Sequence, residues 1–164
     1  MQDAAGRVGA IVRGLRSEEG VSPEGTQREA ALLEWLVTTY ESQRSFSAPG
    51  EGGEPSADEF RDLFSALLAS RFADDGWWSH APEANKLLVL QTLRLLMRDG
   101  ALQEQWALEP GATSAFVTRL HHYADAHAAS ASGEFNLEIV GELAAMAKRL
   151  VRRRRRMQPA QQRR

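Results

Sequence analysis

The four histidines could carry the most specific chemistry in this chain, because clustered imidazoles can hold a metal ion or transfer protons. His121, His122 and His127 fall in one predicted helix, and His80 lies well before it. Adjacent helical residues point about 100° apart, so His121 and His122 do not easily face one ion. The sequence also lacks a histidine pair at i and i+4 with a glutamate between them. We therefore expect structural or solvent-facing histidines and no metal site.

Two pairs of acidic residues are the other catalytic candidates, since paired carboxylates can act as general acid and base. Asp58 and Asp62 lie at the start of a predicted helix, where the helix dipole favours negative charge, and Asp74 and Asp75 lie at a predicted helix end. Capping explains these positions without catalysis. The chain contains no phosphate-binding loop, dinucleotide motif or nucleophile elbow. It has no cysteine, which excludes thiolate nucleophiles and cysteine metal sites. We expect that the chain is not an enzyme, has no cofactor and takes no small-molecule substrate.

A pair of tryptophans is the first candidate for binding another protein. Trp77 and Trp78 follow an acidic turn and are predicted to lie in a loop. Exposed indoles often anchor protein interfaces, because they bury a large area on binding. The alternative is that one indole closes over the core. Both can hold, with one indole inside and one outside.

Charge is strongly segregated along the chain, although its net value is only −2. Residues 148–164 hold nine of the 20 basic residues and none of the 22 acidic ones. The densest part is the uninterrupted run Arg152, Arg153, Arg154, Arg155 and Arg156. Five consecutive arginines spread around all faces of a helix, so this run cannot pack on a core and must meet solvent or an anionic surface.

Several anionic partners fit the arginine run. They are an acidic protein surface such as a tubulin tail, the phosphates of RNA or DNA, an importin that reads a nuclear signal, and the acidic body of the chain itself. No aromatic residue interleaves with the arginines, so base stacking is not indicated. Binding of nucleic acid would therefore have low sequence specificity and a strong salt dependence.

The candidate residues named above lie in segments whose sequences have helical periodicity. Apolar residues repeat at helical spacing, and clean period-2 alternation is absent, so the chain is predicted to be all-α. The expected helices cover about residues 4–16, 26–43, 56–73, 82–97, 101–108 and 113–127, and a last helix enters the arginine run. Two capping boxes are predicted, Thr26 with Glu29 and Ser56 with Glu59. Residues 45–55 are rich in Ser, Gly and Pro and are predicted to form a flexible loop.

The helix after Pro82 is predicted to be the centre of the core. Its leucines occupy almost every side, which is typical of a helix packed by neighbours on several faces. With 43% hydrophobic residues in 164, the chain has enough apolar material for one compact domain. No apolar run approaches the roughly 18 residues needed to span a bilayer, and the N-terminus does not resemble a secretory signal.

Residues 85–151 resemble the armadillo repeat family in five short segments, which follow that family's order of helices. The segments are Leu95 to Asp99, Gln103 to Ala107, Glu109 to Ala112, Phe116 to Leu120, and Leu143 to Lys148. The resemblance implies a short, right-handed α-solenoid with Gly111 at a sharp turn that needs a positive φ. The sequence departs from the family at the insertion His127 to Glu134, and its N-terminal half has no second copy. A short capped array, or one completed by a partner, is the implied architecture.

Together these observations predict an armadillo-like domain over residues 1–151 and an arginine-rich tail over residues 152–164. We expect a non-enzymatic scaffold or interaction subunit of a larger assembly, whose helical groove (85–91 and 113–123) binds a protein while the tail contacts an acidic surface. The alternative is a nucleic-acid-associated subunit that contacts phosphates through its tail. The expected location is cytoplasmic, with the nucleus and the cytoskeleton as alternatives. The candidate partner-binding residues are Trp77, Trp78, Asn85, Arg119 and His122.

Overall fold

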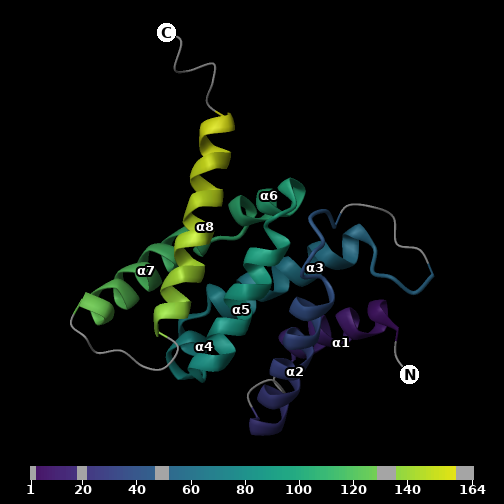
Figure 1. Cartoon of the computed structure of the whole chain (residues 1–164). Helices are drawn as coiled ribbons and strands as arrows, with labels where there is room; N and C mark the ends of the chain where they lie inside the picture. Colours follow the sequence, from purple (N-terminus) through teal and green to yellow (C-terminus); the bar gives the residue numbers. More distant parts are fainter. Residues whose placement is uncertain (1–2, 18–21, 47–51, 129–135, 158–164) are drawn as a thin grey trace.

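The computed structural model describes residues 3–17, 22–46, 52–128 and 136–157, and every regular element among them is helical (Figure 1). The prediction of an all-α chain is therefore confirmed for this part. In chain order the elements are α1 (Ala4–Arg16), α2 (Pro23–Thr39), α3 (Ala57–Leu67), the π-helix η2 (Leu68–Phe72), α4 (Asp75–His80), α5 (Glu83–Leu96), α6 (Gly100–Leu108), α7 (Ala112–Ala128) and α8 (Asn136–Met157).

The start of α2 differs from the predicted one. Ser22 caps the helix by accepting a hydrogen bond from the Gly25 amide at 3.0 Å, and Pro23 occupies the first turn, where its missing N–H is not needed. Thr26 and Glu29 therefore lie inside the helix, and the capping box predicted for them is wrong. Glu29 instead reaches across to another helix and pairs with Arg71.

The second predicted cap is present, but the helix after it is shorter than expected. Ser56 accepts from the Glu59 amide at 3.2 Å and begins α3. The α-helix gives way at Leu68 to a π-helical turn. Asp74 then accepts from the Trp77 amide at 3.1 Å and begins α4, so the two tryptophans lie in a helix and not in a loop.

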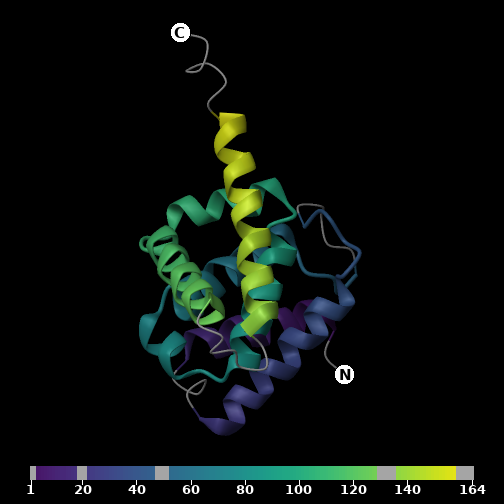
Figure 2. The ribbon, with the colours of Figure 1, turned by 60° about the vertical axis from the view of Figure 1, so that its left-hand side comes forward.

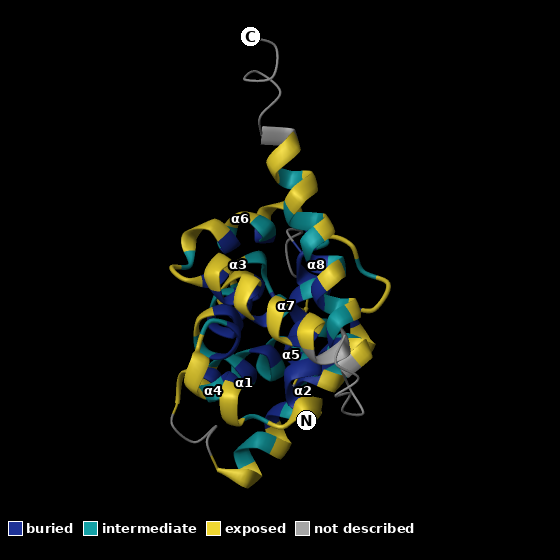
Figure 3. Cartoon of the chain, turned by 90° about the vertical axis from the view of Figure 1, so that its left-hand side faces the viewer, coloured by how far each residue is buried: buried dark blue, intermediate teal, exposed yellow. Residues whose placement is uncertain are grey.

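Helix α5 lies at the centre of the core, as its sequence predicts. It packs against α2, α3, η2 and α8, and residues on most of its sides are buried. Figure 3 shows this buried interior beneath more exposed surfaces of the outer helices. Helix α1 is held against α3, with Val8, Ile11 and Leu15 buried.

The C-terminal helices are arranged around a tight turn. Gly111 has φ +83°, the positive value predicted for it, and connects α6 to α7. Helix α8 packs on both α5 and α7, the two helices between which we predicted a partner groove. Helix α8 then runs through the arginines to Met157 and projects beyond the rest of the molecule (Figure 2). Residues 158–164 lie outside the described part.

The predicted loop 45–55 is anchored at both of its described ends. Phe46 is buried and packs against Tyr40 and Phe60, and its amide donates to Asp99 at 2.7 Å. Pro55 is buried at the other end. Residues 47–51 lie outside the described part, as does most of the predicted insertion 127–134. Among the described helices, none is both long and apolar enough to cross a membrane.

Candidate interaction surface around α8

An apolar groove lies between α6, α7 and the second half of α8. It has a volume of about 590 Å³ and is lined by Trp106, Ala107, Thr113, Phe116, Val117, Ala147, Leu150, Val151, Arg153 and Arg154. We call it the α8 groove. Trp106 and Phe116 are buried, and their rings are 6.0 Å apart in an edge-on arrangement. Val117 and Val151 remain 47% and 51% exposed, so apolar surface faces solvent on both sides of the groove.

The floor and one wall of the α8 groove are fixed by hydrogen bonds. The Trp106 indole donates to the Thr113 hydroxyl at 3.1 Å across the Gly111 turn. The Arg153 guanidinium donates to the Gln103 carbonyl at 2.9 Å, which ties α8 to α6 at the place where α8 leaves the body. These bonds hold the groove in shape, because they join all three helices that form it.

The arginine run forms the basic end of this groove. Arg152, Arg154 and Arg155 are exposed and Arg153 is half-buried, whereas the side chain of Arg156 lies outside the described part. None of the four described side chains takes part in a salt bridge among the described residues. Apolar surface and unneutralised positive charge are therefore adjacent.

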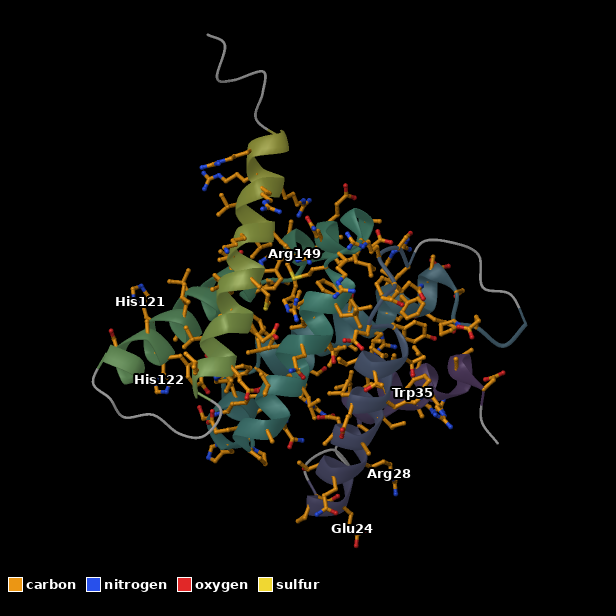
Figure 4. All side chains as sticks on the ribbon, in the orientation of Figure 1. Glu24, Arg28, Trp35, His121, His122 and Arg149 are labelled. Carbon is orange, nitrogen blue, oxygen red and sulfur yellow. The ribbon has the colours of Figure 1, made fainter. Side chains whose placement is uncertain are left out.

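The five predicted partner-binding residues do not form one surface. Trp78, Asn85 and Arg119 are buried. Trp77 is half-buried under the Arg71 guanidinium, and His122 is exposed on α7. Figure 4 shows His121 and His122 on α7, away from the centre of the molecule. Only the half-buried and exposed members can be reached without rearranging the core, and partner binding by these residues stays a prediction.

The buried members instead connect helices to one another. Arg119 of α7 donates to the Phe72 carbonyl at 3.0 Å and to Asp75 at 2.8 Å, and its guanidinium lies 4.8 Å from the centre of the Trp78 ring. Asn85 donates to the Thr26 carbonyl at 3.2 Å and joins α5 to α2. Cation–π contact and hydrogen bonds to backbone carbonyls explain why these polar groups are tolerated inside.

Three of the four acidic candidates form contacts with other groups. Asp74 caps α4, Asp75 pairs with Arg119, and Asp58 pairs with Arg61 at 2.9 Å. Among the described side chains, no three His, Asp or Glu residues are placed to share a metal ion. The side chain of His127 lies outside the described part.

A buried ion pair is the main polar feature that the sequence analysis missed. Arg71 of η2 contacts both carboxylate oxygens of Glu29 from α2, with a shortest distance of 2.7 Å, and both side chains are about nine-tenths buried. Glu29 looked like a capping residue because it follows Thr26 by three positions. No local signal in the sequence indicates a partner 42 residues away.

Comparison with known proteins links part of this chain to an enzyme. No protein-family model matches the chain, and no solved structure matches it. A segment of 95 residues is 38% identical to the human serine/threonine-protein kinase Nek10, and a segment of 76 residues is 38% identical to mouse Nek10. The chain is similar to part of a protein kinase. These segments make up 58% and 46% of this chain but 8% and 6% of the two kinases.

This similarity corrects one expectation. We predicted that the chain is not an enzyme, and the match to a serine/threonine-protein kinase in two species contradicts that prediction. The prediction was based on the absence of phosphate-loop and hydrolase motifs. A search for such motifs cannot detect that a segment of the chain is similar to a part of an enzyme. The matched segments span less than a tenth of the length of either relative.

Proposed function

We propose that this chain is a protein-interaction unit that works in protein phosphorylation, and that it binds an acidic, amphipathic segment of a partner in the α8 groove. The observation that supports this most directly is the adjacency of exposed apolar surface at Val117 and Val151 to the arginines of α8. A partner helix with an apolar stripe and acidic residues beside it complements both features.

The kinase similarity supports the phosphorylation context. Protein kinases transfer phosphate with a glycine-rich loop and with H-R-D and D-F-G motifs. These motifs do not occur in the 164 residues. In a phosphorylation context the α8 groove would recruit a substrate or a regulator. The cytoplasm stays the expected location, with the nucleus and the cytoskeleton as alternatives.

The armadillo-like arrangement of residues 85–151 stays part of the proposal. The order of α5, α6, α7 and α8 and the positive φ of Gly111 support it. Packed helical arrays present grooves that bind extended or helical peptides. In this chain such a groove would be the one beside α8, because an apolar groove lies there between α6, α7 and α8.

Fluorescence anisotropy with a designed peptide tests the proposal. The labelled peptide carries Leu at i, i+3, i+4 and i+7 and Glu at its other positions, and a matched peptide has Ser in place of Leu. We expect Val117→Asp and Val151→Asp to weaken binding of the leucine peptide by about tenfold or more, because each places an acid on the apolar contact. Leu137→Asp is the control, since this exposed leucine lies in α8 outside the groove.

Two outcomes would contradict a groove-based function. Equal binding of the leucine and serine peptides would show that charge alone attracts the ligand. Duplex DNA that binds more tightly than the leucine peptide, with an affinity that falls steeply with salt, would instead support the nucleic-acid alternative. Binding in the groove should persist at salt concentrations that abolish contacts with phosphates.

A further inference from the structure

A second, polar pocket lies near α8, and three arginines from distant parts of the chain converge on it. Glu41, Ser42 and Arg44 come from the turn after α2, Arg98 follows α5, and Arg149 belongs to α8. These five residues line a volume of about 420 Å³, which we call the arginine pocket. Figure 4 shows Arg149 on the side of α8 away from α7. The arginine pocket and the α8 groove are thus on different sides of one helix.

Helix geometry explains this separation. Arg149 and Val151 are two positions apart and point in nearly opposite directions, because successive residues turn by about 100°. Val151 lines the α8 groove, and Arg149 lines the arginine pocket. Arg152, one turn after Arg149, lies on the same side of α8 as Arg149.

The positive charge in the arginine pocket is poorly neutralised. Arg94 nearby is paired with Glu142, but the described residues give Arg44, Arg98 and Arg149 no salt bridge. Arg98 uses its Nη1 atom to donate to the carbonyls of Glu41 and Gln43, which leaves its other nitrogens without a described protein acceptor. Glu41 is the one acidic side chain among the five lining residues.

The pKa of Arg149 also indicates that positive charge in the arginine pocket is poorly neutralised. Its partial burial, together with the positive charges of Arg98, Arg94, Arg152 and Arg44, lowers the pKa of the Arg149 guanidinium. Folding therefore gathers like charges here at a cost in free energy. An anion bound among them would relieve both the repulsion and the loss of hydration.

We propose that the arginine pocket binds the phosphate group of a phosphorylated side chain on a protein segment. A phosphate monoester carries close to two negative charges at neutral pH and three acceptor oxygens, which match converging guanidinium forks better than a single carboxylate does. The Ser42 hydroxyl lines the same pocket and can donate as well. The arginines converge on one compact volume, which suits a single phosphate on a side chain more than the repeated phosphates of a nucleic acid.

This inference does not depend on the function proposed for the α8 groove. The two sites share α8 but no lining residue. Loss of peptide binding in the groove would leave phosphate binding unchanged, and the reverse also holds. The two proposals can therefore fail separately.

Isothermal titration calorimetry with the full chain tests the proposal. The probes are a phosphoserine peptide flanked by glycines, its unphosphorylated counterpart, inorganic phosphate and duplex DNA. We expect the phosphopeptide to bind at least about tenfold more tightly than the unphosphorylated peptide, since hydrogen bonds to charged groups dominate the contact. It should also bind more tightly than inorganic phosphate, because the pocket is larger than a phosphate group and can contact the side chain.

Variants of the pocket decide where the phosphate binds. We expect Arg149→Gln and the exposed Arg44→Gln to weaken phosphopeptide binding by about tenfold each, and Glu41→Gln to strengthen it, because it removes the opposing acid. Arg155→Gln is the matched control: it removes the same charge from the same helix, at an exposed position that lines neither site, and should change affinity by less than about twofold. Circular dichroism checks that each variant is folded.

Three results would overturn the proposal. An Arg155→Gln effect as large as that of Arg149→Gln would indicate general attraction to α8. Inorganic phosphate that binds as tightly as the phosphopeptide would indicate a site for the free ion. Duplex DNA that displaces the phosphopeptide through the same arginines at lower concentration would indicate a nucleic-acid surface.

Discussion

At the scale of single residues, this protein uses buried polar groups mainly to connect helices. Arg71 and Glu29 join η2 to α2, and Arg119 joins α7 to η2 and α4. Removing one partner of the Arg71–Glu29 pair, which is buried on both sides, would leave a buried charge without compensation, which typically costs about 3–5 kcal/mol of unfolding free energy. These residues are therefore needed for the fold that forms the two sites.

The two tyrosines give a prediction about pH. Tyr40 donates to Glu54 at 3.2 Å, and burial followed by the charge and hydrogen bond of Glu54 raises the pKa of Tyr40 from 10.0 to about 12. Tyr123 donates to Glu83 at 2.9 Å, and its pKa is also raised, chiefly by burial. Both hydroxyls should stay protonated in the folded protein at pH values where free tyrosine ionises.

The sign of the resulting stability change follows from linkage. Because folding raises the pKa of Tyr40, its contribution to stability is complete below pH 10 and is lost as the pH rises from 10 through 12. Ultraviolet titration of tyrosinate checks this. The native protein should ionise at higher pH than the protein in concentrated guanidinium chloride, and equal midpoints for the two would contradict it.

At the scale of elements, most helix positions could be predicted because apolar periodicity and caps are local signals. The bounds of α1 agree with the sequence, and the glycine turn at Gly111 was predicted with the correct sign of φ. The predictions that were wrong share a cause, which is that the side chain in question could take more than one structural role. Glu29 fits a capping box by spacing, but it pairs with Arg71, and Asp74 looks like a helix end but begins α4.

Alanine substitutions at two glycines are predicted to change the unfolding free energy in opposite directions. Gly14 lies in α1 and Gly111 in a turn with φ +83°, and a Cβ at either position would have no atom within 4 Å. Gly14→Ala should raise the unfolding free energy by up to about 1 kcal/mol, because alanine favours the helix. Gly111→Ala should lower it by about 1 kcal/mol or more, because alanine disfavours positive φ.

Chemical denaturation of the two variants measures these changes. Each substitution adds the same methyl group to open space, so the difference between them reports the backbone conformation alone. Two changes of the same sign would contradict the structure at one of these positions.

At the scale of the whole molecule, charge and apolar surface meet at the C-terminal half of α8. The sequence shows that the basic residues are concentrated there, and the structure adds that the helix continues through them and projects from the body. Neither site could have been predicted in full. Their lining residues come from separate helices and turns, and which of these meet is set by packing between segments far apart in the chain.

The central claim is that the α8 groove is a binding site for an acidic, amphipathic segment. Nuclear magnetic resonance of the isotope-labelled chain, titrated with the leucine–glutamate peptide, tests it most directly. The account predicts saturable shifts of the backbone amides of Ala107, Val117, Leu150 and Val151, with the amides of α1 and α2 unchanged. Shifts confined to residues 152–155, or no saturable shift at all, would contradict it.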